Sequence, residues 1–397
     1  LTKMNTQQIS PIMGTYSRFD VSMSFGKGCW LFDDKGNKYL DALSGIAVNT
    51  LGHSHPKLIS ALSEQIKKLV HTSNLYKIPL QEKLACKLTE ISHLNSVFFC
   101  NSGLEANEAA IKIARRHGKK LGYLNPKIVV FEKSFHGRSI ATISASANPA
   151  VQKGFEPLLE GFIRVPLNNI DVLSEISKSQ HEISAVFLET IQGEGGINIP
   201  QEKYLLSVRE ICSKNNWLLI LDEVQCGIGR TGKWFAYQWE NIKPDVIPLA
   251  KGLGSGIPIG AVIANEYSGN LMGPGSHGTT FGGNPFAMRA GLETLKIVEE
   301  ENLMKNAAVR GKQILESLNN AFFKNKEIVD IRGRGLMIGI ELKKPCKELA
   351  KEALKKGLLI NVTESNVIRL LPPLIISEEE VETLTKRLIP IINEFIS

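Results

Sequence analysis

Six short apolar runs, separated by longer amphipathic or polar segments, constrain the fold of this chain more than any other feature of its sequence. The runs are Val97–Cys100, Ile128–Phe131, Ala185–Leu188, Leu218–Leu221, Val246–Leu249 and Ala261–Ala264. Short apolar runs of this kind are typical of strands that are buried on both faces of a parallel sheet. Helical spacing of apolar residues follows the first run at Ala106–Ala114, and Tyr204–Asn215 supplies a helix between two other runs. The alternation predicts an α/β architecture in which helices cover a parallel or mixed sheet.

The pattern changes after about Asn284, where long amphipathic helices replace the short apolar runs. Two further strands are predicted at Gly335–Leu342 and Val367–Leu371. The final helix begins with Ser377-Glu-Glu-Glu380, which is a capping box. Strands mixed with helices at this end of the chain are typical of an α+β unit.

These two textures divide the chain into a large and a small domain. We predict a large α/β domain over residues 51–290 and a smaller α+β domain over residues 291–397. The N-terminal segment, residues 1–50, is expected to pack on the smaller domain and to complete it. No internal repeat is visible in the sequence.

The charge balance is mildly basic but does not predict a nucleic-acid partner. The 397-residue chain has 47 Lys and Arg against 40 Asp and Glu, a formal net charge of +7. The basic residues come as scattered pairs on predicted helix faces rather than in a long block. No apolar run reaches the ~18 residues of a membrane helix, and the polar segment Leu1–Gly14 lacks the apolar centre of a secretory signal. We therefore expect a cytoplasmic protein that acts on small molecules.

Cysteine and histidine spacing argues against disulfides and against a metal site. The cysteines form no Cys-x-x-Cys pair and are widely separated, which is typical of reduced thiols in a cytosolic protein. They are Cys29, Cys86, Cys100, Cys212, Cys226 and Cys346. His53 and His55 have ligand-like spacing, but Gly52 and Pro56 predict a turn there and no third ligand is nearby. No metal is expected.

Three glycine-rich stretches resemble nucleotide-binding loops, but their contexts do not fit. Gly227–Lys233 matches the start of a P-loop, yet Trp234 stands where a magnesium-binding Ser or Thr is needed. No strand leads directly into this stretch and no helix directly follows it. Gly254–Gly260 and Gly333–Gly339 are each one residue longer than a dinucleotide fingerprint, and neither opens an obvious helix. The sequence therefore disfavours an NTPase and a Rossmann dehydrogenase.

Lys251 and Asp222 indicate a different chemistry. Lys251 follows the apolar run Val246–Leu249, and Asp222 directly follows the run Leu218–Leu221. Ligands of open parallel sheets bind beyond the carboxyl ends of the strands, so both groups are expected in one crevice. The alternative, that both are surface residues, is disfavoured by the apolar character of the two runs. An aldehyde cofactor needs this pair, because the lysine forms an imine and the carboxylate keeps a pyridine nitrogen protonated.

A phosphate site is predicted where the helix after Val97–Cys100 begins. Ser102 and Gly103 stand at the start of this helix, and the first backbone N–H groups of a helix are free to bind an anion. The alternative for Ser102 is an ordinary N-cap, which the motif alone does not exclude. Phe135-His-Gly-Arg138 adds an aromatic ring suited to stacking on a flat ring and an arginine suited to carboxylates.

Six motifs in fixed order resemble those of class III (subgroup II) pyridoxal-phosphate aminotransferases of fold type I, over nearly the whole chain. The motifs are Asn101–Asn107, Phe135–Arg138, Leu221–Gly232, Leu249–Gly252, Gly278–Pro285 and Arg369–Pro373. Their number and order make the resemblance specific. It implies a transamination with pyridoxal 5′-phosphate as the cofactor.

The resemblance also implies roles for the residues that contact the cofactor. Lys251 attaches the cofactor covalently, Asp222 pairs with its ring nitrogen, and Gln225 lies near its hydroxyl group. Phe135 stacks on the ring, and Ser102–Leu104 hold the phosphate. The full set of implied cofactor-binding residues is Ser102, Gly103, Leu104, Phe135, His136, Asp222, Glu223, Val224, Gln225, Lys251 and Thr280.

Two neighbouring threonines are implied to act in different ways. By the resemblance, Thr280 reaches the phosphate of a second subunit, and Thr279 contributes to substrate binding. A homodimer with shared active sites follows from this arrangement.

Three charged residues are implied to select the substrates. Arg369 binds the α-carboxylate, and Arg138 binds a second carboxylate or the acyl-bearing end of the substrate. Glu194 pairs with Arg369 and moves aside for glutamate. One site can then admit a dicarboxylate in one half-reaction and a δ-amine in the other, because bidentate arginine–carboxylate geometry is discriminating.

Within the family, the N-terminal pattern Gly45–His53 is similar to that of the branch that acts on N-acetylornithine in arginine biosynthesis. Relatives that act on free ornithine carry a tyrosine where Ile46 stands, so the isoleucine favours a substrate whose α-nitrogen is acylated. A buried ammonium without a partner costs roughly 1–3 kcal/mol. The alternatives that stay open are aminotransferases for ornithine, 4-aminobutyrate, succinylornithine or succinyl-diaminopimelate, a glutamate-1-semialdehyde aminomutase, and a non-catalytic cofactor-binding protein.

Overall fold

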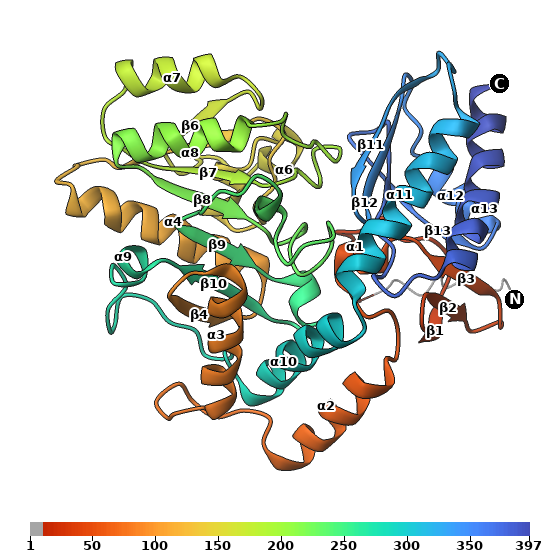
Figure 1. Cartoon of the computed structure of the whole chain (residues 1–397), viewed down its shortest axis with the longest axis horizontal. Helices are drawn as coiled ribbons and strands as arrows, with labels where there is room; N and C mark the ends of the chain where they lie inside the picture. Colours follow the sequence, from red (N-terminus) through yellow and green to blue (C-terminus); the bar gives the residue numbers. More distant parts are fainter. Residues whose placement is uncertain (1–10) are drawn as a thin grey trace, which may run out of the picture.

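The computed structural model describes residues 11–397, in which three β-sheets are surrounded by helices (Figure 1). Residues 1–10, which include most of the polar segment discussed above, lie outside the described part. A seven-stranded sheet with its helices forms one body, and two four-stranded sheets form a second body beside it (Figure 1). Within residues 11–397, no helix is both long enough and apolar enough to cross a membrane.

The large sheet is mixed, with strands in the order β4-β10-β9-β8-β7-β5-β6. Their bounds are β4 (Ser96–Cys100), β10 (Gly260–Ala264), β9 (Val246–Leu249), β8 (Leu218–Asp222), β7 (Ile183–Glu189), β5 (Lys127–Phe131) and β6 (Phe162–Val165). Neighbouring strands are parallel except β10, which is antiparallel to both β4 and β9. Six of these strands coincide with the six predicted apolar runs, which confirms the α/β class. The seventh, β6, has no counterpart among those runs because the exposed Arg164 interrupts its apolar pattern.

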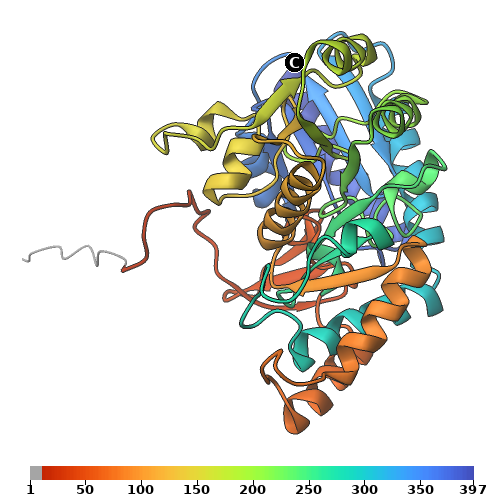
Figure 2. The same ribbon diagram turned by 90° about the vertical axis from the view of Figure 1, so that its left-hand side faces the viewer.

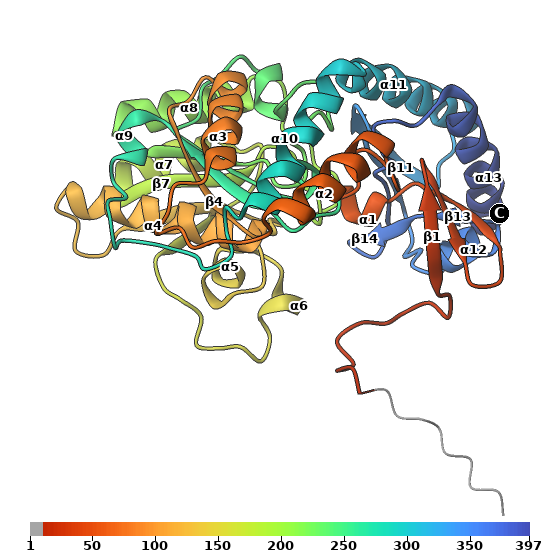
Figure 3. The same ribbon diagram turned by 90° about the horizontal axis from the view of Figure 1, so that it is seen from below.

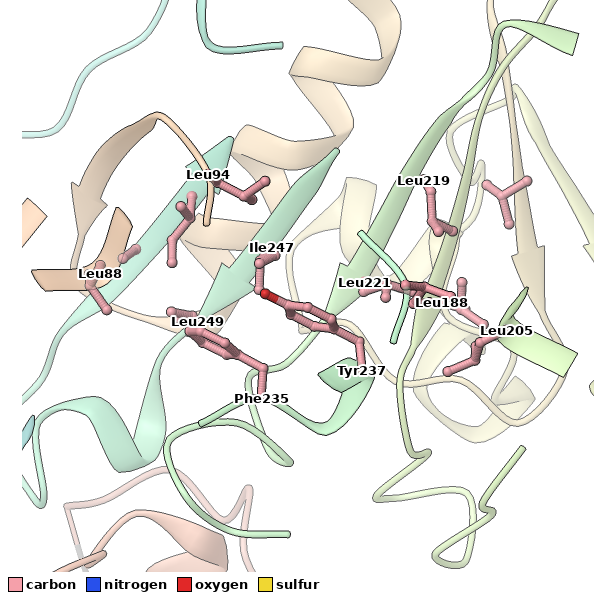
Figure 4. Packing of buried hydrophobic residues seen from close by; sticks show 14 of the residues in the cluster. Leu88, Leu94, Leu188, Leu205, Leu219, Leu221, Phe235, Tyr237, Ile247 and Leu249 are labelled. Carbon is pink, nitrogen blue, oxygen red and sulfur yellow. The ribbon is translucent and has the colours of Figure 1, made fainter. Parts of the chain in front are cut away.

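Side chains of each central strand divide between two apolar cores, one on each face of the large sheet. In β8, Leu219 and Leu221 belong to the core formed with α3, α8 and α10, whereas Leu218 and Ile220 belong to the core under α4. Figure 4 shows Leu219 and Leu221 within the first of these cores. Because successive side chains of a strand point to opposite faces, burial on both faces requires a continuous apolar run.

The helices of this body cover both faces of the sheet. They are α2 (Pro56–Lys68), α3 (Pro79–Ser92), α4 (Gly103–Lys120), α5 (Ile140–Ala145), α6 (Pro149–Gln152), α7 (Ile170–Ser179), α8 (Tyr204–Asn215), α9 (Glu266–Gly269), α10 (Pro285–Glu300) and the 3₁₀ helices η1 (Ala236–Trp239) and η2 (Lys251–Leu253). Helix α4 buries the small residues Ala106, Ala109 and Ala110, which let it approach β8, β9 and β10 closely. On the other face, α3 (orange) packs against α10 (teal) (Figure 2).

The C-terminal part of the second body is an antiparallel sheet covered by helices. Its strands, in spatial order, are β11 (Ile328–Arg334), β12 (Met337–Leu342), β15 (Val367–Leu370) and β14 (Asn361–Thr363). Its helices are α11 (Leu303–Ala321), α12 (Leu349–Lys355) and α13 (Glu378–Ile396). The predicted capping box is confirmed, because Ser377 Oγ accepts from Glu380 N at 3.2 Å and Glu380 Oε2 accepts from Ser377 N at 3.0 Å.

The N-terminal segment forms its own sheet on this second body. Strands β1 (Met23–Lys27), β2 (Trp30–Asp33) and β3 (Lys38–Asp41) are antiparallel, and β13 (Leu358–Leu359) joins parallel to β3. Trp30 Nε1 donates to Glu380 Oε1 at 2.7 Å, which ties this sheet to α13. The sequence gives little sign of these strands, because β1 is almost entirely exposed.

Helix α10 joins the two bodies (Figure 3). Met288 and Leu295 pack into a core of the large sheet, whereas Ile297 and Val298 pack into the core of the second body. The proposed domain boundary near residue 290 therefore falls inside a continuous helix.

Candidate active site

The predicted catalytic groups meet at the carboxyl edge of the large sheet. Strands β7 and β8 are parallel with Glu189 opposite Asp222, and Lys251 follows β9 by two residues. A cavity of about 400 Å³ opens at this edge. It is lined by ten of the predicted residues, which are Ser102, Gly103, Leu104, Phe135, His136, Arg138, Asp222, Val224, Gln225 and Lys251.

Three donors hold the Asp222 carboxylate. Asn107 Nδ2 donates to Asp222 Oδ2 at 2.8 Å, and His136 Nδ1 lies 2.8 Å from the same oxygen. The backbone N–H of Val224 donates to Oδ1 at 2.9 Å. The His136 ring also stacks on Phe187, with 3.9 Å between centroids. These contacts fix the orientation of a buried carboxylate, which is what a pairing with a ring nitrogen requires.

Lys251 is half-buried in the same cavity, and its environment lowers the pKa of its amine. Burial lowers the pKa of Lys251 from 10.5 to about 8, and the positive charge of Arg369 acts in the same direction. The carboxylates of Asp222 and Glu189 oppose this shift. A substantial fraction of the amine is therefore unprotonated near pH 8, so that it can act as a nucleophile and as a base.

The predicted phosphate site lies at the N-terminus of α4. Ser102 is the N-cap, and its Oγ accepts from Glu105 N at 3.2 Å. A Cβ at Gly103 would lie 2.7 Å from a methyl group of Val224, so only glycine fits between α4 and the segment after Asp222. Both interpretations of Ser102 remain compatible with this geometry, because the N-terminus of an 18-residue helix favours an anion in either case.

Glu189 is a residue of the cavity that the sequence interpretation did not include. Its carboxylate accepts from Phe135 N and from Gly193 N, both at 2.9 Å. Burial raises the pKa of Glu189 to about 7, while the charge of His136 opposes the rise. Glu189 directly follows the apolar run Ala185–Leu188, so the signal that singled out Asp222 was also present here.

The predicted carboxylate-binding arginine is buried and already paired. Arg369 Nη1 lies 3.0 Å from Glu194 Oε2 and donates to Gln225 Oε1 at 3.4 Å. Arg369 Nε donates to Asn361 Oδ1 at 3.1 Å. Within residues 11–397, Arg369 Nη2 is buried without a hydrogen-bond partner. The Glu194 side chain is 41% exposed, so it is the partner that can move away.

Arg138 lines the cavity where the cavity meets solvent. It is exposed, and its guanidinium carbon is 5.6 Å from the centroid of the Phe135 ring. An exposed arginine next to the cavity is available to the distal end of a substrate.

Six predicted residues do not line this cavity, and two of them are Arg369 and Glu194, which are described above. Glu223 is buried beneath it and accepts from Ala236 N and Tyr237 N at 2.9 Å each. Thr279 and Thr280 line a separate cavity of about 500 Å³ on the far side of Asn101. The structure of one chain therefore does not bring the two threonines to Lys251.

Ile46 also lies outside this cavity, in an unusual turn. Ile46 is 36% exposed, and Val48 rather than Ile46 lines the cavity. The turn, α1 (Ser44–Ala47), has positive φ at every position, from 47° at Ser44 to 65° at Ile46. Such left-handed backbone costs about 1–2 kcal/mol for each residue other than glycine. Backbone strain of this size persists only where the surroundings impose it.

The alternatives that the sequence disfavoured gain no support from the structure. Gly227–Lys233 forms turns between β8 and η1, without the strand and helix of a P-loop. His53 lies 2.7 Å from Asp41, and His55 lies 3.4 Å from Glu301. In the part of the chain that the structure describes, no three side chains of metal-ligating type come together.

Comparisons with known proteins agree with this geometry. The acetylornithine aminotransferase of Nitrosomonas europaea is 52% identical over 388 residues, covering 98% of this chain and 99% of that protein. The acetylornithine aminotransferase of Aquifex aeolicus is 49% identical over 374 residues, covering 94% and 96%.

Solved structures show the same fold. The ornithine aminotransferase of Toxoplasma gondii superimposes with a TM-score of 0.93 at 32% identity, covering 97% of this chain and 93% of that one. The acetylornithine aminotransferase of Elizabethkingia anophelis gives 0.87 at 36% identity, covering 96% of both. The family pattern of class-III aminotransferases matches residues 14–392. Because this family pattern spans most of the chain and relatives about half identical to it match nearly its whole length, this chain belongs to the class-III aminotransferases.

Proposed function

We propose that this chain transfers the δ-amino group of N2-acetyl-L-ornithine to 2-oxoglutarate, giving N-acetyl-L-glutamate 5-semialdehyde and L-glutamate. The relatives named acetylornithine aminotransferase support this substrate. The observation that carries the proposal is Arg369, which is buried beside the cavity of Lys251 and masked by a partly exposed Glu194. A site that takes an ω-amine and a dicarboxylate in turn needs an arginine that can be covered and uncovered.

The cofactor of class-III aminotransferases is pyridoxal 5′-phosphate, and the residues of the cavity fit it. Asp222 presents a buried, oriented carboxylate for a ring nitrogen, and Lys251 presents an amine with a lowered pKa for an aldehyde. The start of α4, at Ser102 and Gly103, suits a phosphate, and Phe135 lies beside the space left for a ring. When bound, the cofactor supplies an electron-accepting ring that stabilises negative charge at the carbon losing its proton.

Lys251 transfers the proton in the proposed reaction, and Asp222 pairs with the cofactor ring. Lys251 Nζ would remove a proton from the substrate carbon that carries the amine, and would deliver it to the carbon on the other side of that nitrogen, which comes from the cofactor's aldehyde group. It can do so near neutral to mildly basic pH because its pKa is about 8. Asn107, His136 and the backbone N–H of Val224 hold the Asp222 carboxylate in one orientation, in which it can pair with a ring nitrogen.

Glu194, Arg369 and Arg138 then distinguish the two half-reactions. In the first, Glu194 stays on Arg369, and Arg138 takes the acyl-bearing end of N-acetylornithine. In the second, the α-carboxylate of glutamate or 2-oxoglutarate replaces Glu194 on Arg369. The unpartnered Nη2 of Arg369 leaves one donor ready for a bidentate contact with that carboxylate.

Ornithine is the second candidate amino donor, because the Toxoplasma gondii ornithine aminotransferase superimposes over nearly the whole chain. Half-reaction rates with N-acetylornithine, ornithine and 4-aminobutyrate, each without 2-oxoglutarate, separate these functions. We expect the highest kcat/KM with N-acetylornithine. A higher value with ornithine or 4-aminobutyrate would reject the proposed donor, and repeated turnover of glutamate-1-semialdehyde without an oxo-acid would indicate an aminomutase instead.

We further infer that the active enzyme is a homodimer. Thr279 and Thr280 sit outside the cavity of their own chain, next to an exposed apolar surface that includes Leu75, Tyr76 and Phe281. If a second copy of the chain covers this surface, Thr280 of one subunit would reach the phosphate site of the other subunit. Light scattering is expected to give twice the chain mass of 43.8 kDa, and the double variant Tyr76→Glu/Phe281→Glu is expected to lower it. A fully active monomer would contradict the inference.

We place the reaction in arginine biosynthesis and in the cytoplasm. All six cysteines are free thiols, and five of them are buried, which suits a reducing compartment. Cell fractionation with an antibody to the chain would test the location, and arginine auxotrophy on loss of the protein would test the pathway.

A further inference from the structure

The left-handed turn α1 is held in place by one buried carboxylate. Asp41 Oδ1 accepts from Leu43 N at 3.0 Å and from Ser44 N at 2.7 Å, so it binds the first amides of the turn. Asp41 Oδ2 lies 2.7 Å from His53 Nε2. The same side chain therefore closes a loop of the chain from Asp41 to His53, with the strained turn inside it.

This closed loop is bonded on one side to the segment that carries Arg369. Ser44 Oγ donates to Leu371 O at 2.6 Å, and Leu371 N donates to Ala42 O at 2.8 Å. Leu371 follows Arg369 by two residues and lies just beyond the end of β15. The position of the turn therefore sets the position of the strand end that supports the arginine.

On its other side, the loop is bonded to the segment that carries Lys251. Thr50 Oγ1 donates to Gly252 O at 3.1 Å, and Leu51 N donates to Ser255 Oγ at 2.9 Å. Val48, between these contacts and the turn, lines the cavity. The loop thus lies between the lysine and the arginine and is bonded to the backbone next to each.

A buried arginine from the glycine-rich stretch completes the junction. Arg230 Nη1 donates to Leu336 O at 3.1 Å and to Pro372 O, which again follows Arg369 closely. Burial lowers the pKa of Arg230 to about 9, and the charge of Asp41 opposes this shift. Arg230 therefore bonds the segment after Arg369 directly, whereas Asp41 bonds the turn that contacts the same segment. Within the stretch Gly227–Lys233, Arg230 thus bonds the segment that follows Arg369.

We propose that Asp41, with His53, is a positioning residue for the reaction, because it holds the left-handed turn that spaces Arg369 from Lys251. The proposal rests on the function proposed above, in which only glutamate and 2-oxoglutarate use Arg369. Misplacement of Arg369 affects these two substrates and spares N-acetylornithine, which leaves Arg369 paired with Glu194. A contact that acts only on overall stability would affect both half-reactions alike.

The test is the Asp41→Ala holoenzyme, compared in the two half-reactions. We expect kcat/KM for glutamate to fall by about tenfold to a hundredfold, because an error of about 1 Å in positioning costs this much. The fall is expected to reside in KM, and kcat/KM for N-acetylornithine is expected to change by less than about threefold. The dissociation constant of glutarate, an unreactive dicarboxylate, is expected to rise by the same factor as the KM for glutamate when measured by calorimetry.

Two further variants separate positioning from folding. Asp41→Asn keeps an acceptor for the amides of Leu43 and Ser44 and is expected to restore most of the glutamate half-reaction. Asp33→Ala is the matched control, because Asp33 is a buried aspartate of the same sheet that accepts from Asn37 N at 2.8 Å and contacts neither the turn nor Arg369. It is expected to leave the ratio of the two half-reactions unchanged.

Three outcomes would overturn the proposal. These are equal losses in both half-reactions for Asp41→Ala, an unchanged affinity for glutarate, or the same change of ratio in Asp33→Ala. If Asp41→Ala does not accumulate as folded protein, His53→Ala removes one contact of the same loop and is expected to shift the ratio in the same direction. A wild-type enzyme that fails to use N-acetylornithine would reject the proposed function alone, since the glutamate and glutarate measurements do not depend on that donor.

Discussion

The two halves of the cavity are built in different ways. On the side of the large sheet, Asp222 ends β8 and is buried, and Lys251 follows the neighbouring parallel strand β9 and is half-buried. On the side of the second body, Arg369 is buried, but its partner Glu194 is 41% exposed and comes from a loop after β7. The first half consists of fixed groups, and the second consists of one fixed group with an exchangeable cover.

This difference matches what each half has to recognise. A cofactor is the same in every cycle, so rigid and fully bonded groups serve it best. Two substrates of different charge alternate at the other half, so one ion pair there must open and close. An exposed ion pair is weak, typically about 0–1 kcal/mol, whereas a buried arginine without a partner is costly. Glu194 can therefore leave only when another carboxylate takes its place.

The largest expected effect comes from the fixed half. Lys251→Ala removes both the covalent attachment and the base, so kcat is expected to fall by about 10⁴-fold or more. The cofactor should still bind, because Asp222 and the start of α4 remain, but its visible absorption band should shift. Retained turnover with an unchanged spectrum would show that another residue does this work. Lys386→Ala, at an exposed lysine of α13 in the second body, is a suitable control.

The second-largest expected effect separates the cofactor half of the cavity from the substrate half. Arg369→Ala is expected to lower kcat/KM for glutamate by about 10²–10³-fold, because loss of one partner of a buried charge pair costs about 2–5 kcal/mol. The half-reaction of N-acetylornithine should fall much less, and cofactor affinity should not change. Stopped-flow measurement of both half-reactions checks this, and equal losses would place Arg369 in the service of both substrates.

A smaller effect is expected from the exchangeable cover. Glu194→Gln removes the charge that masks Arg369 while keeping its size. We expect kcat/KM for N-acetylornithine to fall by about tenfold and that for glutamate to stay within about threefold, since an exposed partner contributes about 1 kcal/mol. Glu202→Gln is the control variant in the same assay, because Glu202 is an exposed glutamate of the same connection between β7 and α8. If only kcat/KM for glutamate falls in Glu194→Gln, then Glu194 does not have the role assigned to it.

The smallest expected effect is a shift in the midpoint pH at which the apoenzyme captures pyridoxal 5′-phosphate. The pKa of Lys251 is lowered to about 8 in the folded protein, so the amine is protonated below this pH and neutral above it. Only the neutral amine attacks an aldehyde, so covalent capture of pyridoxal 5′-phosphate by the apoenzyme should rise through about pH 8. A midpoint near the ordinary lysine value of 10.5 would show that burial does not act on this amine. The rate of the absorbance change reports the capture directly.

The fixed half could be predicted from the sequence more fully than the exchangeable one. Asp222 and Lys251 are visible because each follows an apolar run, and the ends of parallel strands share one edge. Glu189 carries the same signal after Ala185–Leu188. The direction of β10 could not be read from its run, because an antiparallel strand buried on both faces is equally apolar.

The other half depends on long-range contacts that no local pattern reveals. Asp41 reaches His53 and the amides of the turn only in the folded chain, and β1, which precedes it, is too exposed to show an apolar alternation. The positive φ of Ser44, Ile46 and Ala47 contradicts the local preference of these residues and is imposed by Asp41 and its neighbours. The resemblance, and no pattern of residues alone, indicated the roles of Arg369 and Glu194.

Helix α10 has a consequence for how the molecule folds and how it can be divided. Its first half is buried with Met288 under the large sheet, and its second half is buried with Val298 in the second body. A chain cut at residue 290 would leave each fragment with an apolar surface that only the other fragment covers. Neither fragment is then expected to be stable by itself, and heating should unfold the two bodies in a single cooperative transition rather than in two steps.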